Sequence, residues 1–475
     1  MKLEELLKGV SVIQIHNQRD CDITGVQYNS LKIQEGNLFV AITGFSTDGH
    51  KYIPSAVQNG AVAVVAEKYT EGVDCVQIIV PDSRIAEAQI CANYFGNPAK
   101  KFKLIGITGT NGKTTCTYLI KKILEHSGYK VGLIGTNQNM IGSTVFETGR
   151  TTPDSFELWQ LFDKMAKENV DYVVMEVSSH ALELNRVYGC EFFVGAFTNL
   201  TQDHLDFHIT MENYAAAKQK LFDMSCTAVI NTDDKYGAQM AQKCSCTAIS
   251  YGVNGDADVK AEHIEYSHSG VEFDIDGQHY SLGIPGEFSV YNALCAIGVC
   301  TECGISPQNI SDALKSADGV KGRAEIVNTN TDYTVMIDYA HTPDGIENIL
   351  KAVRGFAKGR VIILFGCGGD RDNTKRPIMG KIAGELADFC IVTSDNPRSE
   401  NPMAIINMIE PGVKQTGKPY VVIPDRREAI KYAIDNAKSG DVIVLAGKGH
   451  ETYQILADGT IHFDEREVIR EILDN

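Results

Sequence analysis

A glycine-rich segment, Gly106-Ile-Thr-Gly-Thr-Asn-Gly-Lys-Thr-Thr115, lies between an apolar run and a helix-like stretch. The apolar run Lys103–Thr108 predicts a strand, and residues 113–127 predict a helix that ends before Gly128. Small residues in such a turn let backbone N–H groups face phosphate oxygens, and the helix N-terminus adds positive partial charge. The segment therefore predicts a phosphate-binding loop in an α/β domain. Lys113 would reach the β- and γ-phosphates of a nucleotide, and Thr114 would ligate Mg²⁺.

This loop departs from the usual pattern at one position. The pattern has a glycine five residues before Gly112, where this chain has Ile107, and the glycines here stand at 106, 109 and 112. We interpret the segment as a variant phosphate loop, because a predicted strand and a predicted helix flank it. The alternative is a glycine-rich turn that contains Gly-Lys-Thr by chance.

Strand-like and helix-like runs alternate along the chain, which predicts an α/β protein with mostly parallel sheets. A length of 475 residues is too great for one ordinary domain. We expect three domains: a small N-terminal one over 1–100, a central one over 101–324 and a doubly wound, Rossmann-like C-terminal one over 325–475. The predicted strands include 37–42, 61–66, 131–134, 172–177, 192–198, 228–231, 334–337, 361–365, 389–393, 420–423 and 442–445. The predicted helices include 52–59, 155–167, 212–223, 376–386, 402–409 and 426–436.

Composition argues against several classes of protein. The net charge is -17 without a basic block, which disfavours binding to nucleic acid. The chain has no run of about 18 apolar residues and no signal-peptide pattern near Met1, so we expect a cytoplasmic protein without membrane insertion. The 13 cysteines are scattered, and the pair Cys300 and Cys303 has no partner pair at zinc-site spacing. We expect buried thiols.

Polar loops follow four of the predicted C-terminal strands. They are Asp338-Tyr-Ala-His341, Gly366-Cys-Gly-Gly-Asp-Arg371, Ser394-Asp-Asn-Pro-Arg398 and Gly447-Lys-Gly-His-Glu451. Ligands of open α/β sheets bind outside the carboxyl ends of the strands. We therefore expect these loops to crowd at one rim and to form a binding site; ordinary surface loops are the alternative.

Acidic and histidine side chains follow two predicted strands of the central domain. Glu176 ends one strand, and the cluster Asp203-His204-Leu-Asp206-Phe-His208 follows the next. Because Mg²⁺ prefers oxygen ligands, Glu176 and this cluster are candidates for a metal site beside the phosphate loop. The alternative is a solvated turn with helix-capping acids. Lys218, in the predicted helix 212–223, would be an exposed lysine on spacing alone.

Taken together, these motifs resemble those of the Mur ligases, and the resemblance covers essentially the whole chain. The loop 108–115, Glu176–His180, Thr198-Asn-Leu with Asp203–Asp206, and Asn292 match the central ATPase unit, and Gly322-Arg323 with 338–341 matches the domain junction. The resemblance implies an ATP-dependent ligase of cytoplasmic peptidoglycan precursor synthesis. In that reaction ATP converts the D-Glu carboxylate of UDP-N-acetylmuramoyl-L-Ala-D-Glu into an acyl phosphate, which an amine then attacks.

The resemblance also implies roles for individual residues around ATP and Mg²⁺. The implied ATP contacts are Gly109, Thr110, Asn111, Gly112, Lys113, Thr114, Thr115, Asn292, Arg323, Asp338 and His341. Lys218 would be carbamylated by CO₂, which turns a cation into an oxygen donor for a hard ion. The implied Mg²⁺ site contains Thr114, Glu176, His204 and carbamylated Lys218. The implied catalytic residues are Lys113, Glu176, His204 and Lys218.

For the UDP-linked substrate, the resemblance places the UDP-sugar end in the first domain, around Tyr28–Ser30 and Thr47–His50, the latter within Phe45-Ser-Thr-Asp-Gly-His. Relatives usually have Asp-Ser-Arg where this chain has Asn29-Ser30-Leu31, so only Ser30 is carried over as a contact. Many relatives have Gln at Leu184, which is not carried over. The implied contacts to the muramoyl-dipeptide are Thr151, Thr152, Ser178 and Arg186.

Asp-Asn-Pro-Arg, at 395–398, marks the relatives that add meso-diaminopimelate. This amino acid has a distal carboxylate that lysine lacks, and the Arg398 fork could bind it through two parallel hydrogen bonds. The implied contacts to the incoming amino acid are Arg371, Asp395, Asn396, Pro397, Arg398, Gly447 and Glu451. The alternatives are a lysine-adding Mur ligase, a folylpolyglutamate synthetase and, from another class, a P-loop switch NTPase. We expect a monomer.

Overall fold

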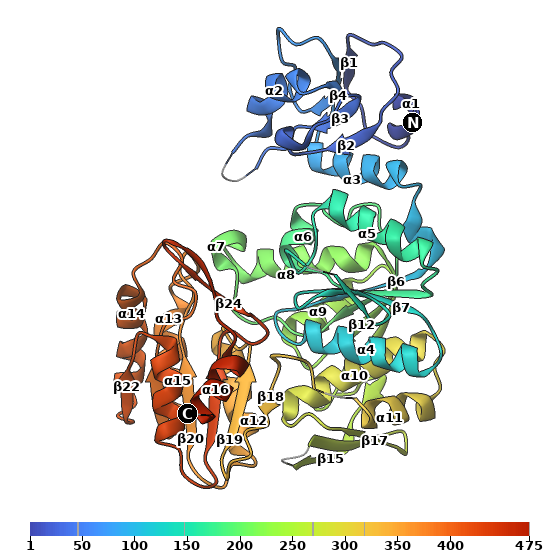
Figure 1. Ribbon diagram of the computed structural model, residues 1–475. Helices are drawn as coiled ribbons and strands as arrows, with labels where there is room; N and C mark the ends of the chain where they lie inside the picture. Colours follow the sequence, from blue (N-terminus) through green and yellow to red (C-terminus); the bar gives the residue numbers. More distant parts are fainter. Residues whose placement is uncertain (45–46, 147, 268–269, 318, 475) are drawn as a thin grey trace. The chain divides into compact units, whose positions relative to one another are not determined.

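A computed structural model describes residues 1–44, 47–146, 148–267, 270–317 and 319–474. The chain forms two compact units, and Figure 1 labels many of their elements. Unit 1 contains Met1–Gly106, Tyr129–Gly195 and Lys220–Cys226. Unit 2 contains Ile107–Gly128, Ala196–Gln219 and Thr227–Asn475. Phe45 and Ser46, which belong to the segment expected to bind the UDP-sugar, lie outside the described residues.

The N-terminal part of unit 1 is a five-stranded sheet in the order β1-β5-β4-β3-β2. These strands are β1 (Gln14–His16), β2 (Gly25–Gln27), β3 (Asn37–Val40), β4 (Ala61–Ala66) and β5 (Val76–Ile79). All neighbours are parallel except β1 and β5. Successive residues of β3 point to opposite faces of the sheet and pack into two different hydrophobic cores. Phe39 packs with α2 (Ile53–Gln58), and Leu38 packs with α3 (Ser83–Tyr94).

The rest of unit 1 shares the core beneath α3. Here β10 (Tyr172–Glu176) pairs in parallel with β7 (Val131–Ile134), and β8 (Asn139–Ile141) and β9 (Thr144–Phe146) continue as antiparallel neighbours. Trp159 and Phe162 of α5 (Ser155–Lys167) are buried in the same cluster as Ile90 of α3. This core fixes the end of β10 and the start of α6 (Ser179–Glu183), where Glu176 and Ser178 stand.

Three strands, β6 (Lys103–Thr108), β11 (Phe192–Phe197) and β12 (Ser225–Asn231), and helix α8 (Met211–Asp223) each contain residues of both units. In unit 2, β12 from Thr227 on pairs in parallel with β13 (Thr247–Gly252), which pairs in parallel with β14 (Val259–Lys260). Helix α10 (Glu287–Glu302) packs against α4 (Lys113–His126) and is buried along most of its length. A small antiparallel sheet follows β14, made of β15 (Glu262–Ser267), β16 (Gly270–Ile275) and β17 (Gln278–Leu282).

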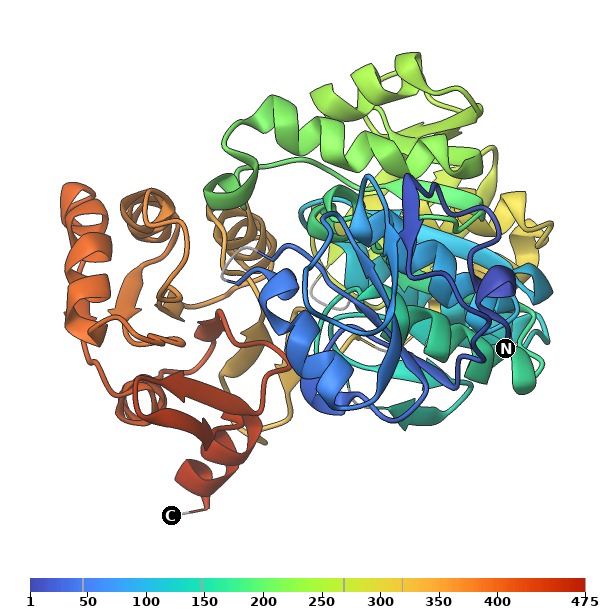
Figure 2. The ribbon, with the colours of Figure 1, turned by 90° about the horizontal axis from the view of Figure 1, so that it is seen from above.

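The C-terminal part of unit 2 is a six-stranded sheet in the order β18-β19-β23-β20-β21-β22, parallel except for β18. Its strands are β18 (Glu325–Val327), β19 (Thr334–Asp338), β20 (Val361–Phe365), β21 (Phe389–Val392), β22 (Tyr420–Val422) and β23 (Val442–Ala446). Helices α15 (Arg426–Asp435) and α16 (Glu465–Leu473) cover one face; α12 (Pro343–Arg354), α13 (Lys375–Leu386) and α14 (Pro402–Gln415) cover the other (Figures 1 and 2). The predicted doubly wound sheet is confirmed.

Helix α14 runs past the end that its sequence predicts. A helix was expected to end at Ile409, two residues before Pro411, but it continues to Gln415 with the proline inside it. Gly412 lets α14 lie very close to α13, since a Cβ there would collide with the backbone of Pro377. Burial along this tight contact outweighs the backbone hydrogen bond that proline cannot donate.

The remaining elements are short and lie between the main ones. They are α1 (Leu3–Leu6), α7 (Leu205–His208), α9 (Lys235–Lys243), α11 (Pro307–Lys315), β24 (Tyr453–Leu456), β25 (Gly459–His462) and 3₁₀ turns at Ser30–Lys32, Gly49–Tyr52 and Pro98–Lys101. Nine of the 13 cysteines are buried free thiols, as expected. Across the described ranges, no helix has both the length and the apolar character that a membrane span needs.

Candidate active site

The predicted phosphate loop joins β6 to α4 and depends on glycine at two positions. Gly109 has φ +146° and Gly112 has φ +85°, a region that side chains with a Cβ rarely adopt. A Cβ on Gly109 would collide with Thr198, and one on Gly112 would collide with the Asn292 amide. Backbone conformation and space therefore both require glycine at these positions. The variant loop is thus a tight turn that ends at the N-terminus of α4.

Two cationic side chains reach this loop within unit 2. Lys113 Nζ donates to the carbonyl oxygens of Gly109 at 2.9 Å and Thr110 at 2.8 Å. Arg323 Nη2 donates to the Thr114 hydroxyl at 3.0 Å. An ammonium, a guanidinium and a helix N-terminus around one turn suit the binding of a polyphosphate.

Lys218 is buried, with 1% of its surface exposed, so the exposed position that spacing alone predicts is wrong. Its Nζ lies 2.7 Å from the Gly109 carbonyl oxygen and 4.5 Å from the centre of the Tyr214 ring. Burial, and then the nearby Lys113 ammonium, lower the pKa of Lys218 well below its ordinary value. Both effects favour the neutral amine, which is the form that reacts with CO₂.

Asp203 lies buried at the centre of a cluster of basic side chains. Its carboxylate is 3.5 Å from Lys375 Nζ, 3.3 Å from His204 Nε2 and 3.9 Å from His341 Nε2. Burial opposes ionisation of Asp203, but His204, Lys375 and His341 together hold its pKa well below the usual range. Burial, and then Lys375, lower the pKa of His341. The structure thus brings His204 and His341 together around one carboxylate.

Lys375 is a candidate functional residue that the sequence interpretation missed. It begins α13, four residues after Arg371, and its side chain is 8% exposed. The available signal was its place just beyond one of the four polar loops. A buried lysine is rare without a partner, and Asp203 is its partner here.

Helix α7, which follows His204, ends in a strained turn. Ile209 has φ +70° and ψ -48°, and the Thr210 N–H donates to the His208 carbonyl at 2.8 Å, which makes a γ-turn with positive φ. This turn is rare, and it is costly for a β-branched residue. The Ile209 side chain is 76% exposed, so packing gives it little compensation.

We expect Ile209→Gly to raise the free energy of unfolding by about 1 kcal/mol, because glycine relieves the strain at a smaller entropic cost. The urea midpoint measures this change. Ile209→Ala is the matched control, because it removes the same exposed side chain but keeps a Cβ at positive φ. Equal midpoints for the two variants would contradict the strain argument.

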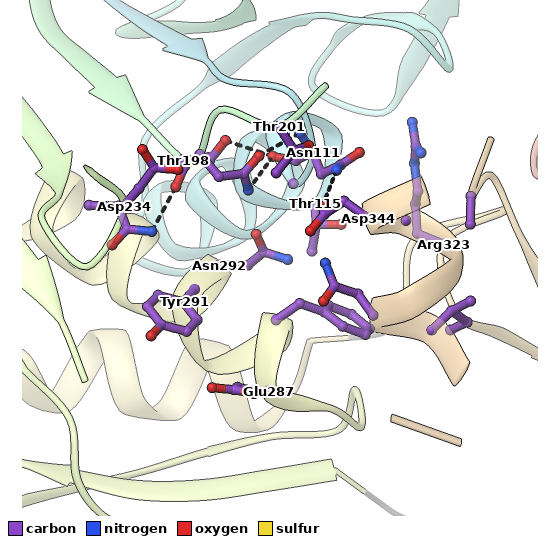
Figure 3. Close-up of a pocket in the computed structure, with 18 of the residues that line it drawn as sticks. Asn111, Thr115, Thr198, Thr201, Asp234, Glu287, Tyr291, Asn292, Arg323 and Asp344 are labelled. Atoms are coloured by element: carbon purple, nitrogen blue, oxygen red, sulfur yellow. Dashed lines mark hydrogen bonds between the residues drawn. The ribbon is translucent and has the colours of Figure 1, made fainter. Parts of the chain in front are cut away.

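A cavity of about 350 Å³ adjoins the loop and lies wholly within unit 2. Figure 3 shows phosphate-loop side chains on one side of it, Tyr291 and Glu287 across from them, and Arg323 at the edge. Its lining includes six of the residues predicted to bind ATP: Asn111, Gly112, Thr115, Asn292, Arg323 and Asp338. The sequence interpretation gave no role to Asp233, which accepts a hydrogen bond from Tyr291 at 2.8 Å. The volume and the mixed lining suit a small-molecule site.

The end of β19 is tied to the segment that carries Arg323. The Asp338 carboxylate accepts hydrogen bonds from the Ala324 and Ala340 N–H groups, each at 2.7 Å. Burial raises the pKa of Asp338. The Arg323 guanidinium lies 4.4 Å from the centre of the Tyr339 ring. These contacts fix Arg323 at the edge of the cavity.

The residues predicted to hold the muramoyl-dipeptide lie together in unit 1. The Thr152 hydroxyl donates to the Glu176 carbonyl at 2.9 Å and accepts from the Ser178 N–H at 3.0 Å. Arg186 Nη1 donates to the Thr152 carbonyl at 3.1 Å. The hydroxyl of the neighbouring Thr151 lies 3.0 Å from the Thr136 hydroxyl. The four predicted contacts therefore form one polar, partly buried cluster at the ends of β10 and α6.

Glu176 is fixed in this same part of unit 1. Its Oε1 accepts from the Thr136 N–H at 2.8 Å, and its Oε2 accepts from the Thr136 hydroxyl at 2.9 Å. Its expected contact with Mg²⁺ stays a prediction. In the described ranges, no three His, Cys, Asp or Glu side chains are grouped so as to hold a metal ion. The predicted Mg²⁺ site is not a group of this kind, because two of its four ligands are the Thr114 hydroxyl and Lys218, which must first be modified.

The segments expected to bind the UDP-sugar form short turns of the N-terminal sheet. Ser30 is buried, and its carbonyl accepts from Asn59 Nδ2 at 3.0 Å, whereas Leu31 is 85% exposed. His50 Nδ1 lies 2.7 Å from Asp48, and its Nε2 accepts from the Glu67 N–H at 3.0 Å. Uridine contacts at these turns stay a prediction.

The four polar loops of the C-terminal sheet meet at one rim, as expected. The Gly447 N–H donates to the Asp338 carbonyl at 3.0 Å, and a Cβ on Gly447 would collide with the Asp395 carboxylate. Arg398 Nη1 donates to the Gly369 carbonyl at 2.8 Å. The loops after β19, β20, β21 and β23 are therefore in contact.

Within this rim, Asn396 Nδ2 donates to the Glu451 carboxylate at 2.8 Å. Pro397 is buried, Arg398 is half-buried with φ +52°, and Arg371 is exposed. A non-glycine residue at positive φ in a polar rim is typical of a functional position. The seven residues predicted to bind the amino acid thus lie on three loops that meet.

Comparisons with known proteins cover nearly all of this chain. Three family descriptions match: "Mur ligase family, catalytic domain" over 22–94, "Mur ligase middle domain" over 107–300 and "Mur ligase, glutamate ligase domain" over 322–449. A protein from Caldanaerobacter subterraneus subsp. tengcongensis is 54% identical over 100% of this chain and 99% of its own. One from Clostridium botulinum is 52% identical over the same shares. Both are named UDP-N-acetylmuramoyl-L-alanyl-D-glutamate–2,6-diaminopimelate ligase.

A solved structure of a protein with the same name gives the same result for the fold. It superposes with a TM-score of 0.70 at 30% identity, over 100% of this chain and 99% of that one. The predicted three-domain α/β fold is therefore confirmed. With a phosphate loop beside a cavity, a polar rim on the C-terminal sheet and relatives above 50% identity along its whole length, this chain belongs to the Mur ligase family.

Proposed function

We propose that this chain is an ATP-dependent ligase that adds meso-diaminopimelate to the D-Glu γ-carboxylate of UDP-N-acetylmuramoyl-L-Ala-D-Glu. The observation that carries the proposal is the pairing, within one unit, of a phosphate-loop cavity with a polar rim that contains Arg398. Relatives named for this reaction, at 54% and 52% identity, support the same choice of amino acid.

The chemistry needs activation because a free carboxylate does not react with an amine. A carboxylate oxygen attacks the γ-phosphorus of ATP, ADP leaves, and an acyl phosphate forms. The amine then attacks the acyl carbon, phosphate leaves, and the amine loses a proton. Lys113 and Arg323, which both reach the phosphate loop, neutralise charge on the transferring phosphoryl group, and the rim holds the amine for its attack on the acyl carbon. When bound, Mg²⁺ supplies further charge neutralisation, held by Thr114, Glu176, His204 and modified Lys218.

Carbamylation of Lys218 fits the surroundings of its amine. The neutral nitrogen adds to CO₂, a C–N bond forms and one proton is released. The product is an anionic oxygen donor beside the loop, where Nζ lies 2.7 Å from the Gly109 carbonyl. An unmodified amine is a poor ligand for a hard ion, whereas carbamate oxygens suit Mg²⁺.

The other parts of the proposal concern substrates and context. The domain over 1–100 binds the UDP-sugar, 101–324 binds ATP, and 325–475 binds the amino acid. The polar cluster of Thr152 and Arg186 in unit 1 holds the dipeptide. The enzyme works as a monomer in the cytoplasm, where ATP and nucleotide-linked precursors are available.

Phosphate release from ATP tests this function directly. We expect release only when Mg²⁺, the UDP-linked dipeptide and an amino acid are all present, with kcat/KM for meso-diaminopimelate at least about 100-fold above that for L-lysine. Omission of each substrate in turn is the control. Release without the dipeptide would point to a switch NTPase, and equal use of lysine would point to a lysine-adding ligase.

A further inference from the structure

Lys448 occupies an unusual position in the polar rim. It follows β23, and none of its surface is exposed. Its Nζ lies 3.1 Å from Asn396 Oδ1 and 3.0 Å from Glu451 Oε2. A buried ammonium is costly unless it is paired and hydrogen-bonded. Here the two partners are both residues proposed to contact the incoming amino acid.

The contacts of Lys448 fix the orientation of the Asn396 amide. Asn396 Oδ1 accepts from Lys448 and from the Ile455 N–H at 3.0 Å, so both donors lie on the oxygen side. Asn396 Nδ2 then faces Glu451 at 2.8 Å. A flipped amide would bring its NH₂ group against an ammonium and a backbone N–H, which cannot accept. The three side chains therefore form a closed, oriented triangle.

The triangle also controls the charge of Glu451. Burial raises the pKa of Glu451, and the Asp395 carboxylate raises it further, whereas Lys448 and the Asn396 amide lower it. Burial, and then the Glu451 carboxylate, raise the pKa of the Tyr339 and Tyr453 phenols, so both groups lie within electrostatic range of Glu451. Lys448 is the cation that touches Glu451 directly, so it opposes the protonation that burial favours.

We propose that Lys448 is a positioning residue for the incoming amino acid: it keeps Glu451 ionised to receive the substrate ammonium and holds the Asn396 amide in one orientation. This inference rests on the proposed function, which places Asn396 and Glu451 at the amino acid. The competing explanation is purely structural, with Lys448 serving to hold Asn396, whose Oδ1 accepts from the Ile455 N–H and so anchors the β24–β25 hairpin.

Lys448→Met tests the proposal, because methionine keeps most of the side-chain volume without the charge. We expect KM for meso-diaminopimelate to rise about tenfold at pH 7, while KM for ATP and for the UDP-linked dipeptide changes less than about twofold. The pH profile gives the sharper readout. Without Lys448 the pKa of Glu451 rises, so KM should fall back toward the wild-type value as pH increases and Glu451 ionises.

Lys448→Gln provides a second variant if the methionine protein folds poorly, since an amide restores a donor to Asn396 but no charge. It should show the same rise in KM and the same recovery at higher pH. Lys448→Arg, which keeps the charge, should recover part of the wild-type KM. Adding Glu451→Gln to Lys448→Met should abolish the pH recovery, because no carboxylate is left to ionise.

Arg360→Met is the matched control for lost stability. Arg360 pairs with Asp441 at 2.6 Å, at the amino-end side of the same sheet. We expect this variant to unfold at lower urea with an unchanged KM for meso-diaminopimelate. A Lys448→Met protein with unchanged KM, or with all three KM values raised equally and no pH recovery, would overturn the inference. A wild-type protein that does not add meso-diaminopimelate would instead refute the proposed function.

Discussion

Lys218→Ala is expected to lower ligase turnover by about 10²–10³-fold, the range for loss of one group that stabilises developing charge in a transition state. The reason lies in the surroundings of the amine. Lys218 is buried beside the Gly109 carbonyl and near Lys113, and both burial and that ammonium lower its pKa. A lysine in such a place is poorly suited to serve as a cation and well suited to react with CO₂.

Short carboxylic acids should restore part of the activity of Lys218→Ala. The substitution leaves room where the side chain lay, and a small carboxylate can place two oxygens where the carbamate would have them. Steady-state phosphate release with increasing acetate or formate measures this rescue. Wild-type enzyme in buffer depleted of CO₂ should lose activity and regain it when bicarbonate is added, whereas the variant should not respond to bicarbonate.

Lys220→Ala is the matched control on the same helix. Lys220 is 43% exposed at its side chain and pairs with Glu183 at 2.7 Å. Its loss should leave turnover nearly unchanged, since exposed ion pairs contribute little. Wild-type turnover by Lys218→Ala would contradict the carbamate role, and rescue by simple chloride salts as well as by carboxylates would show that the effect is only ionic.

Lys218 also illustrates what a sequence pattern cannot reveal. The spacing of α8 predicts exposure, but the partners that bury the amine are supplied by Gly109, far away in the chain, and by Tyr214, whose ring faces it. Lys448 and Lys375 are buried for the same reason, since Asn396, which pairs with Lys448, and Asp203, which pairs with Lys375, come from other loops. Periodicity reports on local structure, and a buried charge depends on tertiary contacts.

The strands of the C-terminal sheet were predictable for the opposite reason. Val361–Phe365 and Val442–Ala446 are buried on both faces, so each reads as a short apolar run. β15 (Glu262–Ser267) is largely exposed and polar, and it gave no such signal. The candidate site also has parts that the sequence predicts and parts that it does not. Its glycine loop and polar strand ends were predictable, because they interrupt apolar runs, whereas the pairing of Asp203 with Lys375 and His341 became visible only in three dimensions.

Arg398→Ala should reduce kcat/KM for meso-diaminopimelate by about 10²–10³-fold, because a guanidinium can form two parallel charge-assisted hydrogen bonds with the distal carboxylate. Arg398 is already oriented: Nη1 donates to the Gly369 carbonyl at 2.8 Å. Alanine keeps a Cβ at the same positive φ, so the backbone strain is little changed. The loss should therefore report on the side chain.

Two comparisons make this result specific to the distal carboxylate. L-lysine lacks that group, so kcat/KM for lysine should change little in Arg398→Ala, and the preference for meso-diaminopimelate should collapse. Arg398→Lys should recover only a small part, because an ammonium cannot make the paired bonds of the fork. Arg354→Ala is the control. Arg354, the last residue of α12, pairs with Asp388 at 2.8 Å, and its loss should leave kcat/KM unchanged for meso-diaminopimelate and for lysine.

An unchanged KM for meso-diaminopimelate in Arg398→Ala would contradict this assignment and direct attention to Arg371. That guanidinium is exposed, donates to its neighbour's carbonyl at 3.1 Å, and stands on the adjoining loop. The two arginines differ in one physical respect. Arg398 is half-buried, with its guanidinium bonded to the Gly369 carbonyl and its backbone N–H to the Ile455 carbonyl, so a carboxylate there is partly shielded from water, whereas Arg371 is exposed. Because charge-assisted hydrogen bonds strengthen as water is excluded, the half-buried guanidinium should account for most of the selectivity.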